Sequence, residues 1–439
     1  ISGLSLGAPD WTATADTLGP INFTPQAGVV ADDARVYATA PGVVAAFDAD
    51  TGAALWSAPV PFPILDSWST PAISQDADAL IAASGTALVA LDRTTGATLW
   101  TTDLGRPVVN ASPCVSDAPG PADRVFITDH SFTSSAPGSL ICVNTGPFDP
   151  AYNPFTPGEI VWETALPGDT SGNTPAVHAG IVYVSTSDDG SGGPGIVCAY
   201  DAHATSTPAP IWTTPNPQPH NFFGPVSVRA GAVYASSYNF GGGQSSANTI
   251  KLDAHTGALI WTTPTVRTNA APVVFADGTI AVSGGLPVSD STPFYGAAPS
   301  IDILVDHGPS VTRAASTFDA THDDLDADGA WDPAEPFLSL GGWGHLPIGL
   351  VVNGTPHLIV GTMDEPTALS PLTHAVALSV IDLSRHPNDP DFVVSTIPDA
   401  GTTPAFVAGR VFSTSSSGLR AFTLGAGASP ARRERGIRP

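Results

Sequence analysis

The residues with the sharpest chemical signal form an acidic loop late in the chain. Asp324, Asp326 and Asp328 alternate, a glycine follows, and Glu335 ends the run, so the segment matches D-x-D-x-D-G-x5-E throughout. Alternate carboxylates can converge on one hard cation, and a terminal glutamate can add two more oxygens. The pattern predicts a calcium loop whose ligands are Asp324, Asp326, Asp328, Ala330 through its carbonyl, Asp332 and Glu335.

The flanks of this loop do not resemble the helices of an EF-hand. Pro333 and Pro336 interrupt the exit, so we expect an EF-hand-like loop without paired helices. A solvated acidic loop without a metal is the alternative. Calcium is expected to rigidify a long insertion there rather than to take part in a reaction, because connections of this length are otherwise disordered or functional.

Adjacent aspartate and histidine residues are the other candidates for chemistry. They would suit a hydrolase or lyase with an Asp/His site on the face of the molecule that carries its long loops, and the candidate pairs are Asp129–His130, Asp306–His307 and His322–Asp323. Neighbouring residues of a strand point to opposite faces, so such pairs rarely act together. We therefore assign no catalytic residue, and we favour a protein that is not an enzyme.

The elements that must position these residues repeat along the chain. Prolines open successive apolar runs at Pro25, Pro71, Pro113, Pro175, Pro225, Pro272, Pro347 and Pro404. Each run leads into further strand-like runs, separated by Asp, Ser or Gly turns. A closing signature recurs with one spacing at Asp48…Thr51-Gly52…Trp56, Asp92…Thr95-Gly96…Trp100 and Asp253…Thr256-Gly257…Trp261. The tryptophan is interpreted as a structural ring on the outer strand that covers the seam to the next repeat.

Four-stranded sheets at this period predict an all-β fold, an eight-bladed β-propeller of antiparallel blades. The last repeat lacks a fourth strand, whereas the chain begins with an orphan strand around Trp11. We predict that this N-terminal strand completes the last blade and closes the ring. Residues 1–427 then form one domain, with the calcium loop as an insertion at 317–340 between blades six and seven, followed by a basic tail at 428–439.

A smaller set of long connections, at 146–158, 202–209 and 383–390, is expected on one face of this ring, and most of the long connections are expected on the other. The larger set joins the second and third strands of blades three to seven, at 130–138, 187–194, 238–247, 285–297 and 363–373. Residues before the marker prolines should line the mouth of the central channel on the same face. The candidates for ligand contacts there are Trp68, Asn110, Asn269, Trp343 and His345. Turn formation by the asparagines and apolar plugging by the aromatic rings form the structural alternative.

The Asp-x-x-Thr-Gly-x-x-x-Trp signature with a proline-marked first strand resembles the pyrroloquinoline-quinone-type repeat. The resemblance extends from Trp11 to about Leu424 and is weakest in blades six and seven, whose outer strands lack the tryptophan. It implies an eight-bladed propeller and two classes of function. One is a quinone- and calcium-dependent dehydrogenase, and the other is a non-catalytic scaffold such as the outer-membrane assembly lipoprotein.

Three departures from the dehydrogenase pattern favour the scaffold. In the dehydrogenases the quinone often lies over adjacent cysteines, but Cys114, Cys142 and Cys198 are far apart in this sequence. The one lysine, Lys251, falls on a third strand, and the inner-strand runs lack a glutamate. We therefore expect a calcium-stabilised binding protein, secreted, on the cell surface or periplasmic, with a protein or glycan partner on the face that carries the long connections.

Bulk properties limit the partners. The net charge of −25 argues against nucleic acid or an anionic membrane as a partner, and no apolar run is long enough to span a bilayer. The three cysteines are expected to be free thiols, although a disulfide between Cys142 and Cys198 stays open. The tail at 428–439 carries a net charge of +3, so we expect it to dock on an acidic surface, either of its own ring or of another copy in a homo-oligomer.

Overall fold

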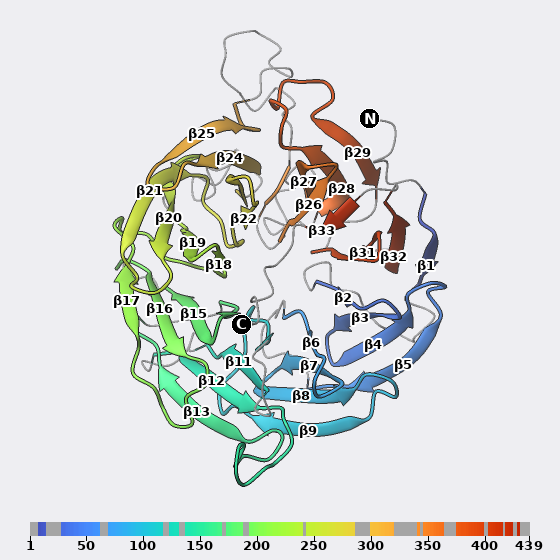
Figure 1. Cartoon of the computed structure of the whole chain (residues 1–439). Coiled ribbons are helices and arrows are strands. Elements are labelled where there is room, and N and C mark those ends of the chain that lie inside the picture. Colours follow the sequence, from blue (N-terminus) through green and yellow to red (C-terminus); the bar gives the residue numbers. More distant parts are fainter. Residues whose placement is uncertain are drawn as a thin grey trace.

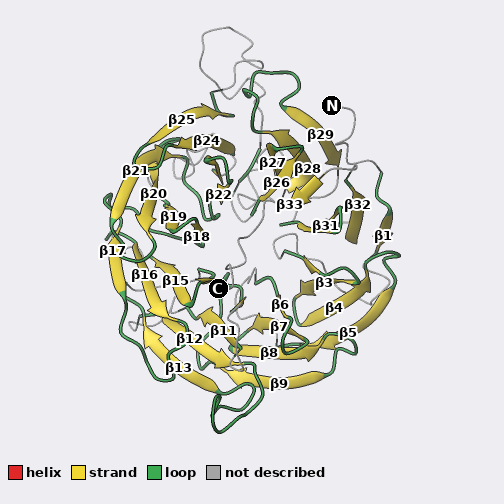
Figure 2. Cartoon of the chain, viewed as in Figure 1, coloured by secondary structure: helices red, strands yellow, loops and turns green. Residues whose placement is uncertain are grey.

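A computed structural model describes most of the chain. The described residues are 8–14, 28–61, 69–116, 123–130, 137–168, 173–187, 193–239, 243–285, 299–319, 340–342, 346–363, 375–398, 403–415, 418–424 and 428–430. These residues form eight antiparallel sheets arranged as a ring, and Figure 2 shows strands and loops without helices in the described part. No helix among them is long and apolar enough to cross a membrane. The predicted all-β, eight-bladed propeller is confirmed.

The first four blades follow one another along the chain (Figure 1). Blade one contains β2 (Val30–Ala31), β3 (Arg35–Ala40), β4 (Val43–Asp48) and β5 (Ala54–Pro59). Blade two contains β6 (Ala72–Ser74), β7 (Ala79–Ser84), β8 (Ala87–Asp92) and β9 (Thr98–Asp103). Blade three contains β10 (Cys114–Val115), β11 (Arg124–Thr128), β12 (Ser139–Asn144) and β13 (Ile160–Ala165). Blade four contains β14 (Ala176–His178), β15 (Ile181–Thr186), β16 (Ile196–Asp201) and β17 (Trp212–Pro215).

The remaining blades complete the ring. Blade five contains β18 (Ser227–Arg229), β19 (Ala232–Ser236), β20 (Ala247–Asp253) and β21 (Leu259–Thr265). Blade six contains β22 (Val273–Val274), β23 (Thr279–Gly284), β24 (Ser300–Asp306) and β25 (Val311–Ser316). Blade seven contains β26 (Ile348–Val352), β27 (Thr355–Met363), β28 (Ala375–Asp382), β29 (Val393–Pro398) and an added strand, β33 (Ala428–Pro430). Blade eight contains β30 (Ala405–Val407), β31 (Arg410–Ser415), β32 (Gly418–Thr423) and β1 (Trp11–Ala13).

The N-terminal strand closes the ring as the sequence predicts. β1 pairs with β32 in antiparallel register, with Trp11 opposite Ala421. Trp11 then reaches the next blade, because its indole N–H donates to the carbonyl of Ala49 at 3.0 Å. Arg410 also bridges blades eight and one through an ion pair with Asp50 at 2.7 Å. The two ends of the repeat array are thus joined by both strand pairing and side-chain contacts.

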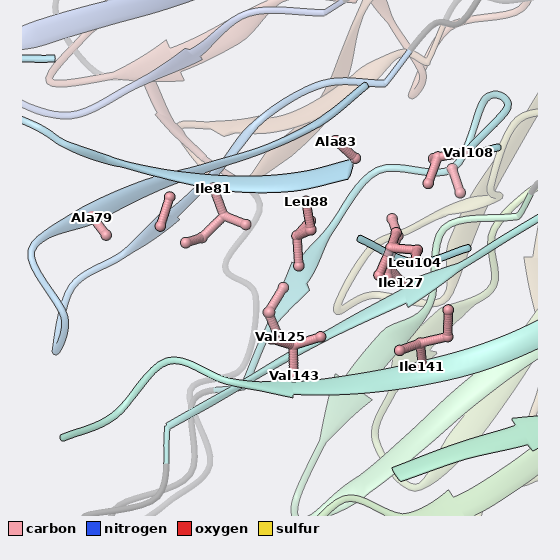
Figure 3. Packing of buried hydrophobic residues seen from close by; sticks show 12 residues of the cluster. Ala79, Ile81, Ala83, Leu88, Leu104, Val108, Val125, Ile127, Ile141 and Val143 are labelled. Carbon is pink, nitrogen blue, oxygen red and sulfur yellow. The ribbon is translucent and has the colours of Figure 1, made fainter. Parts of the chain in front are cut away.

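The hydrophobic core is divided among the seams, by which we mean the interfaces between neighbouring blades. Middle strands read as continuous apolar runs because they are buried on both faces, and successive side chains serve opposite seams. Leu80 of β7 packs towards blade one, whereas Ile81 packs towards blade three. Figure 3 shows the second of these clusters, in which Ile81 and Leu88 meet Val125 and Ile127 across the seam.

The recurring tryptophan seals the seam as predicted. The ring of Trp56 lies over Gly96 of the next blade, and its indole N–H donates to the carbonyl of Arg93 at 3.0 Å. The same pairing joins Trp11 to Gly52 and Trp212 to Gly257. Glycine is required in the turn for two reasons: its φ is positive, and a Cβ would lie 2.4–2.6 Å from the indole ring at these three seams.

Most marker prolines stand directly before an inner strand, but two do not. Pro71 precedes β6 and Pro404 precedes β30, where a missing N–H removes no ladder bond. In blade one the inner strand begins at Val30, so Val29 holds that position, and Pro25 lies outside the described residues. Pro225 lies two residues before β18 rather than one. Proline therefore marks the connection that leads into an inner strand, but its distance from the first residue of that strand varies.

The cysteines are free thiols, as expected. Cys142 and Cys198 are fully buried and share one hydrophobic cluster at the seam of blades three and four. Burial raises the pKa of both thiols; for Cys198 the pKa is about 12. The thiols serve the packing of this seam.

The seam contact can be tested by substituting one of its glycines. We expect Gly96→Ala to reduce the free energy of unfolding more than Gly105→Ala does. Both glycines have nearly the same φ, 74° and 75°, so alanine costs about 1–2 kcal/mol of backbone energy at either site. A Cβ at position 96 would lie 2.6 Å from the ring of Trp56, whereas one at position 105 meets nothing within 4 Å.

The overpacking should add about 1–3 kcal/mol to the loss in Gly96→Ala. Denaturant unfolding followed by tryptophan fluorescence measures both variants against the wild-type protein. Equal losses in the two variants would contradict the role assigned to the tryptophan–glycine contact.

Candidate functional site

Third-to-fourth connections of 10 to 15 residues, at 145–159, 202–211 and 383–392, emerge on one face of the ring, and the long second-to-third connections gather in one arc of the other face. We call this second face the loop-bearing face; it carries the connections between second and third strands and those that lead into each inner strand. In blades eight, one and two the second-to-third connections are two residues long, at 416–417, 41–42 and 85–86. In blades three to seven they are much longer, at 129–138, 187–195, 237–246, 285–299 and 364–374. The second-to-third connections are therefore short in three contiguous blades and long in five. We call blades three to seven the elaborated blades.

The mouth of the channel on this face is held by a relay of backbone amides and hydroxyls. The amide of Gly28 donates to Thr70 Oγ1 at 3.0 Å, the amide of Thr70 to Ser112 Oγ at 2.9 Å, and the amide of Ser112 to Thr174 Oγ1 at 2.9 Å. Each bond joins one blade to the next. The amide of Leu346 likewise donates to Thr403 Oγ1 at 3.0 Å, between blades seven and eight.

Three asparagines lie in the connections that form this mouth. Asn173 is buried, and its amide donates to the carbonyl oxygens of Ser185 and Phe222 at 3.0 and 2.7 Å. Asn110 adopts a left-handed φ of 65°, a conformation that asparagine tolerates in turns. The carbonyl group of Asn269 lies 2.5–2.6 Å from where a Cβ on Gly224 would stand, so it packs closely against the preceding connection.

The structure does not bring the predicted ligand contacts at the mouth together in one described cluster. Asn110 and Asn269 precede the inner strands of blades three and six, which are separated by two blades in the ring. Trp68, Trp343 and His345 lie outside the described residues. Their role as ligand contacts stays a prediction.

A charged cluster at blade three pins the base of a long connection. Asp129 accepts the amide of Ser139 at 2.6 Å and pairs with Nε of Arg106 at 3.1 Å. The same guanidinium donates to the Pro137 carbonyl at 2.6 Å and to Ser139 Oγ at 2.7 Å, and that hydroxyl donates to Glu163 at 2.7 Å. The cluster fixes both ends of the connection, and we did not predict the role of Arg106 because its partners are distant in sequence.

The two titratable residues of this connection have opposite pKa shifts. Burial raises the pKa of the Asp129 carboxyl from 3.8 to about 6, despite the Ser139 amide and the Arg106 guanidinium. Burial lowers the pKa of the His130 imidazole from 6.5 to about 4. Both pKa shifts have the same cause, because removal of a side chain from water disfavours its charged form.

A second polar network fixes the connection that leads into blade five. Asn248 at the start of β20 exchanges hydrogen bonds with Asn216, at 3.1 and 2.8 Å, and accepts one from the Ser237 hydroxyl at 2.7 Å. Nδ1 of His220 lies 3.3 Å from the same amide oxygen. The network joins the entry connection to the adjacent second-to-third connection, so neighbouring loops on this face share one anchor.

The pair Asp306–His307 is not on the loop-bearing face, which corrects our expectation. Asp306 ends β24, a third strand, and the connection to the outer strand emerges on the opposite face. Its carboxylate pairs with Lys251 at 2.8 Å and accepts hydrogen bonds from Tyr234 at 2.8 Å and Trp261 at 3.2 Å. Burial opposes ionisation, but Lys251 and Tyr234 outweigh it and lower the pKa of Asp306.

This ion pair replaces the glycine contact at the seam of blades five and six. Trp261 donates to a carboxylate here, whereas Trp11, Trp56 and Trp212 donate to a backbone carbonyl and lie over a glycine at three other seams. Asp306 is thus a structural residue. His307 is the exposed neighbour, with its Nε2 at 3.0 Å from Thr312 Oγ1.

The predicted calcium loop lies outside the described residues. In the sequence it belongs to the connection between β25 and β26. His322–Asp323 lies in the same segment. Within the described residues no group of three or more His, Cys, Asp or Glu side chains is placed to hold a metal ion.

We expect Asp129 and His130 to have opposing effects on stability between pH 6.5 and pH 4. The Asp129 carboxyl takes up its proton at a higher pH in the folded protein than in the unfolded chain, so it stabilises the fold as the pH falls through 6. His130 takes up its proton at a lower pH in the folded protein, so it destabilises the fold over nearly the same range.

Asp129→Asn should remove only the first effect. The unfolding free energy of the variant should then fall relative to wild type by about 2 kcal/mol between pH 7 and pH 4, and His130→Asn should show the reverse trend. Denaturant unfolding over this pH range measures both differences. Stability curves that run parallel to wild type in both variants would contradict the assignment.

Comparisons with known proteins identify relatives of the repeat. Residues 40–129 and 84–219 match the family model described as outer membrane protein assembly factor BamB. No curated protein matches the sequence. The structure of BamB from Moraxella catarrhalis is 15% identical, with a TM-score of 0.57 over 95% of this chain and 97% of that chain.

Enzymes share the same architecture. A europium-containing methanol dehydrogenase is 12% identical, with a TM-score of 0.59 over 93% of this chain and 84% of that chain. A quinohemoprotein alcohol dehydrogenase from Pseudomonas putida HK5 is 12% identical, with a TM-score of 0.53 over 100% of this chain and 80% of that chain. At these identities the likeness concerns the fold.

Proposed function

We propose that this chain, an eight-bladed propeller of pyrroloquinoline-quinone-type repeats, is a non-catalytic scaffold that binds a protein partner through its loop-bearing face. We place it in the cell envelope or outside the cell, as part of an assembly. The observation that carries the proposal is the confinement of long second-to-third connections to blades three to seven. Binding loops on a rigid frame are the usual way in which such a ring acquires a function.

The use of the charged side chains supports this proposal. Asp129 and Glu163 are engaged with Arg106 and Ser139 at the base of a connection, and Asp306 is engaged with Lys251 at a seam. These contacts hold loops and blades in place. A scaffold needs its loops at fixed positions, because any mobility of the binding surface adds an ordering cost to association.

The match of residues 40–219 to the assembly-factor family model also supports a protein partner and an envelope location. The same fold occurs in the two dehydrogenases, so a quinone- and calcium-dependent dehydrogenase is the competing function. Addition of pyrroloquinoline quinone and calcium separates the two. A stoichiometric quinone absorption band with alcohol oxidation would contradict the scaffold.

We further propose that calcium binds the loop from Asp324 to Glu335 and stabilises the insertion between blades six and seven. The support is the agreement of carboxylate spacing, glycine and terminal glutamate in the sequence. A glycan on the loop-bearing face is an alternative ligand to a protein.

The partner surface can be mapped with a photo-crosslinking amino acid placed at single positions. We expect covalent adducts with one protein, in extracts of the cells that make this chain, from position Ser245 in the long connection of blade five. Pro41 lies in the two-residue connection of blade one, and Thr94 lies in a turn on the opposite face; both serve as controls. Adducts of equal yield from all three positions would contradict a binding face confined to the elaborated blades.

The calcium proposal predicts a ligand-dependent melting temperature. Millimolar calcium should raise the melting temperature of the wild-type protein, and Glu335→Gln should remove most of that increase because the terminal ligand loses its charge. A site at about 100 times its dissociation constant contributes about 2.7 kcal/mol. Asp76→Asn, which removes an exposed carboxylate from a turn in blade two, is the control. An increase that survives Glu335→Gln and Asp324→Asn would contradict the site.

A further inference from the structure

The sheet of blade seven has one strand more than the others in the described part of the chain. Its order is β29-β28-β27-β26-β33, so β33 pairs with the innermost strand, on the side that faces the channel. Figure 1 shows β33 beside β26, closer to the centre of the ring. The pairing is antiparallel and places Leu350, Val351 and Val352 opposite Pro430, Ser429 and Ala428.

The inner edge of β26 differs from the corresponding edges elsewhere. β26 is five residues long, whereas the inner strands described in the other blades have two or three. A strand paired on both sides keeps its extended conformation over more residues. The greater length is consistent with a second hydrogen-bonded neighbour.

The prolines fix which backbone groups face the channel. Val351 lies opposite Pro356 of β27, and proline has no N–H, so this is a non-hydrogen-bonded pair and the amide of Val351 points the other way. The carbonyl of Pro356 is used elsewhere, because it accepts the amide of Leu383 at 3.0 Å. The amide and the carbonyl of Val351 therefore both point towards Ser429 on the channel side, which makes Val351 and Ser429 the hydrogen-bonded pair.

The proline in the added strand obeys the same alternation. Because Val351 and Ser429 form the hydrogen-bonded pair, Leu350 and Pro430 form a non-hydrogen-bonded pair. Pro430 thus stands where a missing N–H costs no ladder bond. The backbone donors and acceptors of residues 428–430 therefore match those on the inner edge of β26.

From this register we propose that the inner edge of β26 is a binding site for an extended peptide strand, and that the chain occupies it in cis with its own C-terminal segment. The recognition is through the backbone, as in the addition of a strand to a sheet edge. The sequence that follows β33 adds charge: residues 428–439 carry a net +3, and the rest of the chain carries −28. Attraction at long range therefore favours the segment over an acidic peptide.

The amide of Val351 reports on the occupancy of this edge. We expect its hydrogen exchange to be about tenfold slower or more in the chain of 439 residues than in a chain ending at residue 427. A synthetic peptide of residues 426–439 should restore the protection in trans to the shortened chain. The restoration should weaken as salt rises from about 0.05 to 0.5 M, because the charges are screened. Equal exchange rates in the two chains would overturn the proposal.

Two proline substitutions separate backbone pairing from a general effect of the tail. Ser429→Pro removes the N–H that pairs with Val351 and should abolish the protection. Ala428→Pro stands at a non-hydrogen-bonded position, like Pro430, and should retain it. Protection lost equally in both variants would contradict the register.

The assembly state distinguishes cis from trans occupancy. Protection of the Val351 amide that is independent of protein concentration, in a particle of unchanged mass, supports occupancy in cis. Protection that rises with concentration together with a dimer would overturn occupancy in cis and assign the site to the tail of a second copy.

Discussion

The burial of each blade by its two neighbours is the constraint on which the rest of the structure depends. The middle strands are apolar on both faces, so a blade alone would expose two hydrophobic surfaces. Eight hydrophobic clusters lie at the eight seams, and several seams are sealed by a tryptophan over a glycine with an indole hydrogen bond. Closure of the ring covers the outer faces of blades one and eight, and Trp11 supplies the tryptophan–glycine contact at that seam.

In a closed ring of this kind, few buried side chains are available for a function that differs from one protein to another. The buried polar side chains of the described residues join connections to strands, as Asn173, Asp129 and Asn248 do. The elaborated arc of blades three to seven can therefore diversify while the seams stay the same. The sequence likeness to one assembly-factor family and the fold likeness to dehydrogenases are both compatible with this division.

The fold was predictable from the sequence because its determinants are periodic. The spacing from Asp through Thr-Gly to Trp revealed the outer strands, and the orphan strand at Trp11 revealed the closure. Contacts between distant residues were not predictable: Arg106 with Asp129, or Lys251 with Asp306, follow no local pattern. β33 was missed because three residues with Gly and Pro nearby show no alternation typical of a strand, and they form a strand only by pairing with the inner edge of β26.

The hydrogen bonds between amides and hydroxyls at the channel mouth have a common donor-to-acceptor direction along part of the ring. From blade one to blade four, each amide donates forward to the hydroxyl of the following blade. Blade one has glycine at that position, where a Cβ would lie 2.7 Å from Thr70 Oγ1, so it has no hydroxyl to receive a bond from blade eight. There the sense reverses, and the amide of Val29 donates back to the carbonyl of Thr403. The hydrogen bonds described from blade one to blade four and between blades seven and eight thus share one sense, and the sense reverses between blade one and blade eight, the blade in which the first and last strands of the array meet.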